Sequence, residues 1–439
     1  MQAFLEGTRV LDLTQLLPGP YATTMLADLG AEVIKVERPG VGDPVRSRDP
    51  SVGDRSYTLL TRNRNKKSIA IDLKHDDGRE AFLELARTAD VVVESFRPGV
   101  VDRLGIGYDD VRKVNEDIVY CSITGYGQDG PYVSRSGHDL NYIGVAGLLG
   151  LTGESDGQPA IPGYQIEDFS GGMYAAFAIS TALAGVRGGA GGDHIDVSMT
   201  DAVASFSMVY LDQFAGEGTV PRRGETTLTG SHPGYDVYET GDGESITLGA
   251  LEAHFWENLC NALGLPEYID DHIGPNGELS DDRRAEIADA FAERLSERPL
   301  AEWLERFDEY DVPAGPVHGY DDLFEEPHFE ARGLFDEIEV EEDPDSDSTT
   351  SVKQVNVPLR FERFDPDEKT PAPYLGEHTT ELLGELGYDD GDQTESGVGR
   401  IAKQEIEREI RSVAHGHVDV ALRGDDEAVV YVEEGDIGT

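Results

Sequence analysis

One carboxylate lies in a motif whose residue types suit catalysis. Asp168 belongs to the segment QIEDFSGG, at the point where an expected loop meets a glycine-rich helix over about 168–186. A carboxylate at a helix N-terminus is favourably placed by the helix dipole. Gly171 and Gly172 would let a ligand or another backbone approach closely. The pattern fits a nucleophile or a base, and it fits a plain helix-capping aspartate equally well.

A histidine in a second short motif is the other acid–base candidate. His138 lies in the segment SGHD over 136–139, after a glycine-rich loop. An imidazole suits general acid–base work near neutral pH, although a structural histidine would look the same. The spacing between His138 and Asp168 does not by itself bring the two side chains together.

Basic residues gather in one window of an otherwise acidic chain. Residues 46–74 carry three acids and eight bases, Arg46, Arg48, Arg55, Arg62, Arg64, Lys66, Lys67 and Lys74. One interpretation is a set of ion pairs with acidic neighbours. The other is a site for a small ligand with several phosphates, because clustered cations favour polyanions.

Two further patterns are weaker. The segment GYGQDG over 125–130 fits G-x-G-x-x-G, but Pro131 follows where a dinucleotide site needs a helix. A glycine turn that shapes a pocket wall is the preferred interpretation. The histidines outside SGHD lack the spacing of metal ligands, and no metal site is predicted; they include His232, His254, His318 and His328.

The elements that must position these motifs follow an α/β pattern. Short apolar strands are expected at 8–13, 31–37, 68–73, 90–95, 117–123 and 194–199, with helices at about 20–30, 77–88, 109–116, 168–186 and 200–214. Strands that alternate with helices indicate βαβ units and a parallel sheet.

The rest of the chain predicts a smaller α+β domain and then a segment that returns to the large domain. A hairpin is expected over 235–248 and helices over about 252–310, with Trp256 and Trp303 in their cores. The domains expected are 1–220 for the first part of the large domain, 221–330 for the small domain, 331–390 for the return to the large domain, and 391–439 for an acidic extension of unknown role. In that extension a polar helix at about 400–413 and one hairpin are expected.

Composition narrows the function classes. The 439 residues include 87 acidic and 36 basic ones, for a net charge of −51. That charge excludes a general nucleic-acid binder, because most of the surface would repel phosphates. Lysine supplies only eight of the 36 bases, a bias typical of proteins adapted to molar salt. Two cysteines and the absence of a signal peptide or a long apolar run predict a cytoplasmic protein without membrane spans.

Seven motifs, in order, resemble the class III CoA-transferases, the CaiB/BaiF family, which includes the α-methylacyl-CoA racemases. The resemblance covers about residues 5–385 and is carried by VLDLTQLLPGPYATTMLADLGAEVIKVERPG (10–40), NRNKKSIAIDLK (63–74), VVVESFRPGVVDRLGIGY (91–108), ITGYGQDGPY (123–132), GHDLNYIGVAGLLGLTGE (137–154), EDFSGGMYAA (167–176) and YDVYETGDGESITLGALEAHFW (235–256).

The resemblance implies a fold and a ligand. It implies a Rossmann-like large domain, a smaller α+β domain and an interlocked homodimer whose active site lies between subunits. It implies coenzyme A thioesters as substrates, with no permanently bound cofactor, and this would account for the basic window. The matching CoA contacts are Leu17, Pro18, Arg38, Ile71, Asp72, Leu73, Lys74, Ser95, Phe96, Arg97, Arg103, Ser136, Gly137, His138 and Asp139.

It also implies two candidate reactions. In the transferases the aspartate that matches Asp168 attacks an acyl-CoA thioester, and an aspartyl-CoA thioester then passes CoA to an acceptor acid. In the racemases the residues that match His138 and Asp168 are the two bases, Glu252 matches a glutamate that supports the histidine, and Arg97 matches a further active-site residue. The sequence lacks the glycine-rich loop of the oxalate-type transferases near 250 and has His138 in place of their tyrosine.

The sequence therefore predicts an acyl-CoA:carboxylate CoA-transferase for small di-acids, for example from succinyl-CoA to mesaconate. An α-methylacyl-CoA racemase is the alternative. A CoA-binding protein without catalysis is a third possibility, against which the intact Asp168 and His138 argue.

Overall fold

Two compact units make up the chain. The computed structural model describes residues 3–272, 279–342, 348–364 and 369–388, and the backbone of 418–422 and 428–432. The first unit comprises Met1–His138, Glu167–Ala202 and Leu334–Thr439. The second comprises Asp139–Ile166 and Val203–Gly333.

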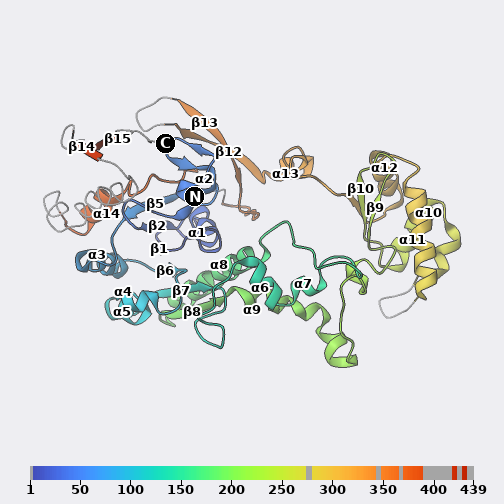
Figure 1. The fold of residues 1–439 in the computed structure, drawn as a ribbon, viewed down its shortest axis with the longest axis horizontal. Helices are drawn as coiled ribbons and strands as arrows, with labels where there is room; N and C mark the ends of the chain where they lie inside the picture. Colours follow the sequence, from blue (N-terminus) through green and yellow to red (C-terminus); the bar gives the residue numbers. More distant parts are fainter. Residues whose placement is uncertain are drawn as a thin grey trace, which may run out of the picture. The chain divides into compact units, whose positions relative to one another are not determined.

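A six-stranded parallel sheet organises the first unit (Figure 1). Its strands are β1 (Arg9–Asp12), β2 (Glu32–Glu37), β5 (Lys66–Ala70), β6 (Val91–Glu94), β7 (Val119–Thr124) and β8 (Asp193–Ser198), in the order β5-β2-β1-β6-β7-β8. The predicted parallel α/β sheet is confirmed, and its strand bounds move by no more than a few residues. The chain runs outward from β1 to β5 and then outward again from β6 to β8.

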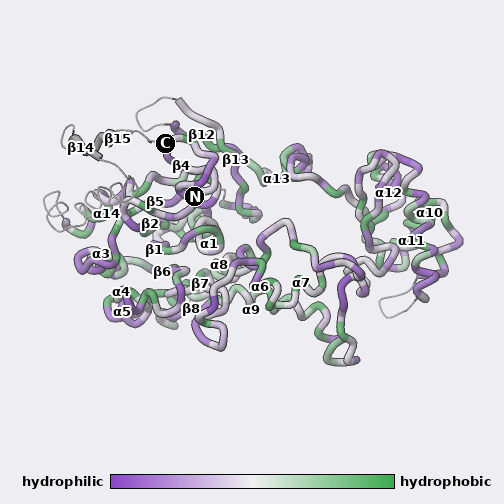
Figure 2. The backbone as a smooth tube through the Cα atoms, viewed as in Figure 1, coloured by the Kyte–Doolittle hydropathy of each residue, from purple (hydrophilic) through white to green (hydrophobic). Residues whose placement is uncertain are grey.

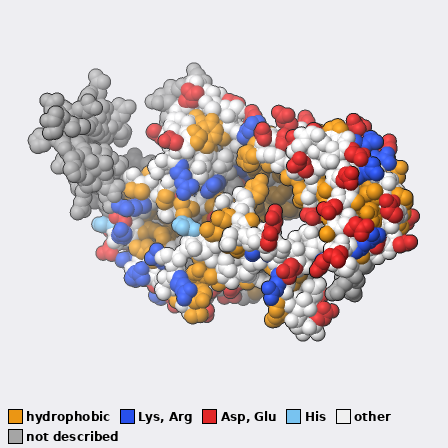
Figure 3. Space-filling model, turned by 45° about the vertical axis from the view of Figure 1, so that its right-hand side comes forward, with side chains coloured by type: hydrophobic (Ala, Val, Ile, Leu, Met, Phe, Trp, Pro, Cys, Tyr) orange, Lys and Arg blue, Asp and Glu red, His pale blue; other side chains and the backbone are white. Residues whose placement is uncertain are grey.

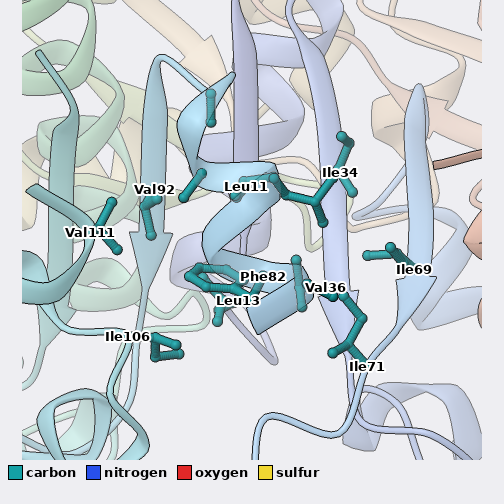
Figure 4. Packing of buried hydrophobic residues seen from close by; sticks show 14 of the residues in the cluster. Leu11, Leu13, Ile34, Val36, Ile69, Ile71, Phe82, Val92, Ile106 and Val111 are labelled. Carbon is teal, nitrogen blue, oxygen red and sulfur yellow. The ribbon is translucent and has the colours of Figure 1, made fainter. Parts of the chain in front are cut away.

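Helices cover one face of the sheet with a hydrophobic layer. In α3 (Asp76–Arg87) the side chains of Ala81, Phe82 and Leu85 are fully buried, as the helical spacing of its apolar residues requires. Figure 4 shows Phe82 among strand residues such as Leu11 and Ile34. The helices α5 (Tyr108–Val114) and α14 (Thr379–Glu385) supply Val111 and Leu382 to the same core.

Two more hydrophobic helices belong to this unit, α1 (Pro18–Asp28) and α8 (Ile166–Arg187). In Figure 2 the hydropathy colours of both helices can be compared with those of the more hydrophilic α3. By length and composition α8 could cross a membrane. However, its residues Gly171, Ala175 and Ile179 are buried within the protein, so we interpret α8 as a packed helix of the unit.

Among the shorter elements of the first unit, one hairpin packs against a segment far from it in the sequence. The hairpin β12 (Phe335–Glu341) and β13 (Thr349–Val355) packs Ile338, Val340 and Val352 against Val45, Leu59 and Leu60. The remaining elements are β3 (Ser51–Val52), β4 (Arg55–Ser56), α2 (Tyr57–Leu60), α4 (Val100–Leu104), α9 (Met199–Ala204), and a hairpin of β14 (Val418–Leu422) with β15 (Ala428–Val432). The helix expected at 400–413 lies outside the described residues.

The second unit is an antiparallel sheet with helices around it. The strands β9 (Val237–Glu239), β10 (Ser245–Leu248) and β11 (Ala314–Pro316) pair in the order β11-β10-β9. Trp256 and Trp303 are buried in its core, as predicted. The helices are α6 (Asp139–Val145), α7 (Leu148–Leu151), α10 (Ala253–Leu263), α11 (Asp281–Leu295), α12 (Leu300–Tyr310) and α13 (Pro327–Arg332).

The helix expected at 200–214 is confirmed, but its hydrogen-bonding type changes along its length. After α9 the chain continues as a 3-10 helix over Ser205–Tyr210 and, after Leu211 and Asp212, as a π-helix over Gln213–Glu217. Its large apolar side chains face outward, with Met208 76% exposed and Phe214 56% exposed. These side chains thus lie outside the cores that the described residues form.

Candidate functional site

The predicted CoA segments follow the carboxyl ends of neighbouring strands. Leu17 and Pro18 follow β1, Arg38 follows β2, Ile71–Lys74 follow β5, and Ser95–Arg97 follow β6. Parallel strands end at a common sheet edge, and ligands bind where the strand order reverses, which here lies between β1 and β6.

Two hydrogen bonds connect these segments across the sheet edge. The backbone N–H of Gln15 donates to Ser95 Oγ at 3.4 Å, which bridges the loops after β1 and β6. The guanidinium of Arg97 donates to Ser136 Oγ at 3.0 Å. Arg103, on α4, is exposed, as are Arg38 and Lys74. Exposed cations at such an edge suit a phosphate-rich ligand.

The basic window has a mixed role. Four of its eight cations form ion pairs within the protein: Arg46 with Glu37, Arg64 with Asp28, Lys66 with Asp12, and Lys67 with Glu32 and Glu381. Arg55 and Arg62 donate to backbone carbonyls. The ion-pair interpretation therefore holds for the first four. Their acidic partners come from other segments, so the charge count of the window does not include them.

Behind the loop after β1 lies a buried network of charges. Lys66 Nζ contacts Asp12 at 3.0 Å, and Lys35 Nζ contacts Asp43 at 3.0 Å, with all four side chains at most 1% exposed. Burial alone would raise the pKa of Asp12, but the ammonium groups of Lys66 and Lys35 hold that pKa below its usual range. The Asp12 carboxylate therefore stays ionised.

The network fixes a strained turn. Leu16 has a φ of 69°, a conformation that side chains rarely adopt. Its N–H donates to Asp43 at 3.3 Å, its carbonyl accepts from Arg62 at 3.3 Å, and the carbonyl of Thr14 accepts from Lys35 at 2.8 Å. Gly19 is required because a Cβ there would lie 2.2 Å from the Thr14 side chain. The turn thus presents Leu17 and Pro18 in one fixed position.

This turn meets the start of α8, which carries Asp168. A Cβ on Gly172 would lie 2.6 Å from the carbonyl oxygen of Pro18, so glycine lets the helix touch the turn. The rings of Phe169 and Tyr21 add an edge-to-face contact at 5.1 Å. Asp168 is half-buried in the first turn of α8. The sequence therefore identified both the position of Asp168 and the close approach that its glycines allow.

Arg62 is a residue near Asp168 that the sequence analysis did not single out. Burial lowers the pKa of its guanidinium, as does the guanidinium of Arg48, while the carboxylates of Asp168 and Asp43 act in the opposite direction. Arg62 therefore lies within electrostatic reach of both Asp168 and Arg48. The only hint in the sequence was the place of the two arginines in the basic window.

Glu94 is a second residue that was missed. It ends β6 and is 1% exposed, and one of its oxygens accepts from the N–H of Phe96 at 2.7 Å. Burial, partly offset by hydrogen bonds from Ser122 and Phe96, raises the pKa of Glu94 to about 7. Its carboxyl therefore holds the loop Ser95–Arg97 and titrates near neutrality. The signal in the sequence that could have revealed a buried acid was its position directly after three valines.

The remaining predicted residues divide between the units. His138 is exposed at the end of a first-unit segment, and Asp139 begins α6 of the second unit. Glu252 precedes α10 in the second unit. Gly127 and Gly130 have φ values of 82° and 87°, and no helix opens in the loop between β7 and α6. The G-x-G-x-x-G segment is thus a turn, as preferred. Among the described residues, no group of three or more His, Cys, Asp or Glu could hold a metal ion.

Comparisons with known proteins agree on one family. The model of CoA-transferase family III matches residues 5–379. The succinyl-CoA:glutarate CoA-transferase of Homo sapiens is 39% identical over 88% of this chain and 87% of its own length. The succinyl-CoA:mesaconate CoA-transferase of Haloarcula marismortui is 34% identical over 88% and 97%. The human α-methylacyl-CoA racemase is 33% identical over 88% and 94%.

A solved structure gives the same answer. The crystal structure of a CaiB/BaiF family protein from Brucella suis aligns with a TM-score of 0.75 and 31% identity, covering 88% of this chain and 100% of that one.

Proposed function

The chain belongs to CoA-transferase family III, and we propose that it moves coenzyme A between small dicarboxylic acids through a covalent intermediate on Asp168. The observation that carries this proposal is the half-buried Asp168 in the first turn of α8, packed through Gly172 against Pro18 and within electrostatic reach of Arg62. Relatives that transfer CoA from succinyl-CoA to glutarate or mesaconate support succinyl-CoA as donor and a C5 di-acid as acceptor.

The chemistry requires a nucleophilic carboxylate and a retained CoA. The Asp168 carboxylate attacks the thioester carbonyl and expels the CoA thiolate, which leaves a mixed anhydride. The thiolate then attacks the Asp168 carbonyl, releases the donor acid and forms an aspartyl-CoA thioester. The acceptor carboxylate attacks that thioester, expels the CoA thiolate and forms a second mixed anhydride. The thiolate then attacks the acyl carbon of the acceptor, which gives the new acyl-CoA and releases the Asp168 carboxylate. Nucleophilic catalysis thus divides one difficult step into easier ones.

We propose that the loops at the sheet edge bind CoA. The exposed cations Arg38, Lys74, Arg97 and Arg103 would bind its phosphates, because guanidinium and ammonium groups donate strongly to phosphate oxygens. The backbone of 71–74, 95–97 and 136–139, with Leu17 and Pro18, would enclose the rest. No permanently bound cofactor is needed for the reaction.

Racemisation of a 2-methylacyl-CoA is the second candidate. It is favoured by the racemase relative and by the presence of His138, Asp168, Glu252 and Arg97. In that reaction His138 and Asp168 would remove and return the α-proton as general bases and acids.

We also propose an interlocked homodimer in a salt-rich cytoplasm. The outer face of α8 exposes Met173, Tyr174 and Phe177, the last at 70%, and exposed apolar patches mark protein interfaces. Acidic side chains are spread over the face in Figure 3, among hydrophobic and basic ones. The net charge of −51 suits a protein kept soluble by hydrated carboxylates. Native mass spectrometry in ammonium acetate would give twice 47.8 kDa for the dimer.

One incubation in molar KCl and D2O separates the two reactions. It contains succinyl-CoA, a 2-methylacyl-CoA and the free acids glutarate and mesaconate, and mass spectrometry reads the thioesters. A new glutaryl- or mesaconyl-CoA, with no deuterium in the methylacyl-CoA, is the expected result. One deuterium at the α-carbon without a new thioester would replace transfer by racemisation.

A further inference from the structure

The guanidinium of Arg62 is half-buried but lightly used. Its one hydrogen bond within the described residues is donated to the Leu16 carbonyl at 3.3 Å. A guanidinium carries five N–H donors, so most of the donors of Arg62 have no acceptor in the part of the chain that the structure describes. Half-buried donors of this kind are available to a ligand.

A second guanidinium lies near Arg62. The guanidinium of Arg48 is close enough to oppose the protonation of Arg62, and the carboxylates that favour protonation are Asp168 and Asp43. Asp43 is already paired with Lys35 at 3.0 Å. A ligand carboxylate that binds Arg62 would therefore be attracted by both guanidinium groups.

The direction of Arg62 is fixed by the strained turn that presents Pro18. The guanidinium is tied to Leu16, and Pro18 lies against Gly172, one turn of α8 from Asp168. A ligand carboxyl group held by Arg62 would therefore keep a constant position relative to the nucleophile. Guanidinium groups bind carboxylates through two parallel hydrogen bonds, which gives orientation as well as attraction.

We propose that Arg62, assisted by the more exposed Arg48, binds the far carboxylate of the dicarboxylic substrate while its near carboxyl group reacts at Asp168. This inference rests on the proposed transferase function and adds the residues that select di-acids over mono-acids. It assigns the same contact to the donor succinyl group and to the acceptor acid, since both carry a free carboxylate beyond the reacting one.

A matched pair of acyl-CoA substrates tests this assignment. Succinyl-CoA and butyryl-CoA have acyl chains of the same length, and butyryl-CoA lacks the far carboxylate. In Arg62→Gln an amide can still donate to Leu16, so the turn keeps its bond while the charge is lost. We expect kcat/KM for succinyl-CoA to fall about 100-fold and that for butyryl-CoA to change less than about threefold, the range for a lost charge-assisted pair.

Three further variants sharpen the result. Arg62→Lys keeps the charge without the planar fork and should lose about tenfold for succinyl-CoA alone. Arg48→Gln should lose a few-fold, because its side chain is exposed. Arg87→Gln removes an exposed guanidinium on α3 that pairs with Glu84 and should leave both donors unchanged. Equal losses for both donors in Arg62→Gln, or no loss, would overturn the inference.

A binding measurement keeps the inference separate from the proposed function. The affinities of free glutarate and of valerate, its mono-acid counterpart, are measured by calorimetry on CoA-saturated wild type and Arg62→Gln in molar KCl. Arg62-dependent binding of glutarate alone, without any turnover, would reject the transferase and keep the carboxylate site. CoA transfer by the wild type, with the same glutarate affinity in wild type and Arg62→Gln, would keep the transferase function and reject the carboxylate site.

Discussion

The two halves of the parallel sheet treat buried carboxylates in opposite ways. Around β1, β2 and β5, Asp12 pairs with Lys66, Asp43 with Lys35, and Glu37 with Arg46. At the end of β6, Glu94 is just as buried, but its hydrogen bonds come from Ser122 and Phe96, which carry no charge. In the first half, neighbouring cations lower the pKa of Asp12 and of Glu37, while burial raises the pKa of Glu94 to about 7.

The two kinds of buried carboxylate hold two different loops in place. The half around β1, β2 and β5, called the compensated half below, holds the turn before Pro18, next to the proposed nucleophile. Its cations hold the pKa of Asp12 below the usual range, while burial lowers the pKa of Lys66 to about 8. The half that contains Glu94 holds the proposed CoA loop Ser95–Arg97 with a carboxyl group whose pKa is about 7. We therefore expect the loop after β6 to respond to pH near neutrality, and the surroundings of Asp168 to respond only as pH approaches about 8.

Removing one cation should break the compensated half most severely. Lys66→Met leaves Asp12 without its nearest cation and removes donors to Thr23, Asn63 and the Pro20 carbonyl. We expect the free energy of unfolding to fall by about 3 to 5 kcal/mol, as for other broken buried pairs, measured by urea unfolding in molar KCl.

The adjacent lysine provides the control. Lys67 is 29% exposed and pairs with Glu32 and Glu381 at the surface, so Lys67→Met should cost less than about 1 kcal/mol. Equal losses in the two variants would show that the buried network has no special role.

At the end of β6, replacing the buried acid should raise the free energy of unfolding. The pKa of Glu94 is about 7 in the folded protein and near 4.5 in the unfolded chain. Between these values the native state holds a proton that the unfolded chain releases, so the free energy of unfolding falls as pH rises through this window. Glu94→Gln removes that penalty and still accepts from Phe96. We expect a gain of about 2 kcal/mol at pH 8 and almost none at pH 4.5.

Unfolding curves at several pH values measure this effect. Glu84→Gln, on the exposed side of α3, is the control and should keep the wild-type pH profile. A loss of stability in Glu94→Gln at pH 8 would mean that the ionised carboxyl group is favourable and that the two halves do not differ.

The contact between the turn and α8 should give the smallest effect. In Gly172→Ala the added methyl would lie 2.6 Å from the Pro18 carbonyl, so the helix must shift. Because small displacements of reacting groups are costly, we expect kcat to fall about tenfold with little change in the affinity for CoA. Gly384→Ala on α14, where a Cβ meets nothing within 4 Å, should leave kcat unchanged.

The sequence predicted the sheet well because buried parallel strands are nearly continuous apolar runs, as in VVV before Glu94. It also placed Asp168 at a helix start, because the glycines that follow it have a local signature. It left two interpretations of the basic window open, because the partners of Arg64 and Lys66, Asp28 and Asp12, come from segments 36 and 54 residues away. Arg62 and Glu94 were missed because their roles depend on burial and on neighbours that spacing does not reveal.

The most direct test of the central claim is to trap the intermediate on Asp168. The protein is incubated with succinyl-CoA without an acceptor, quenched in acid and digested, and the peptide that contains Asp168 is weighed by mass spectrometry. We predict that this peptide gains the mass of CoA less one water, that the adduct disappears when glutarate is added, and that Asp168→Asn never forms it. A wild-type protein that makes a new thioester without any adduct at Asp168, or with an adduct on another residue, would contradict the account.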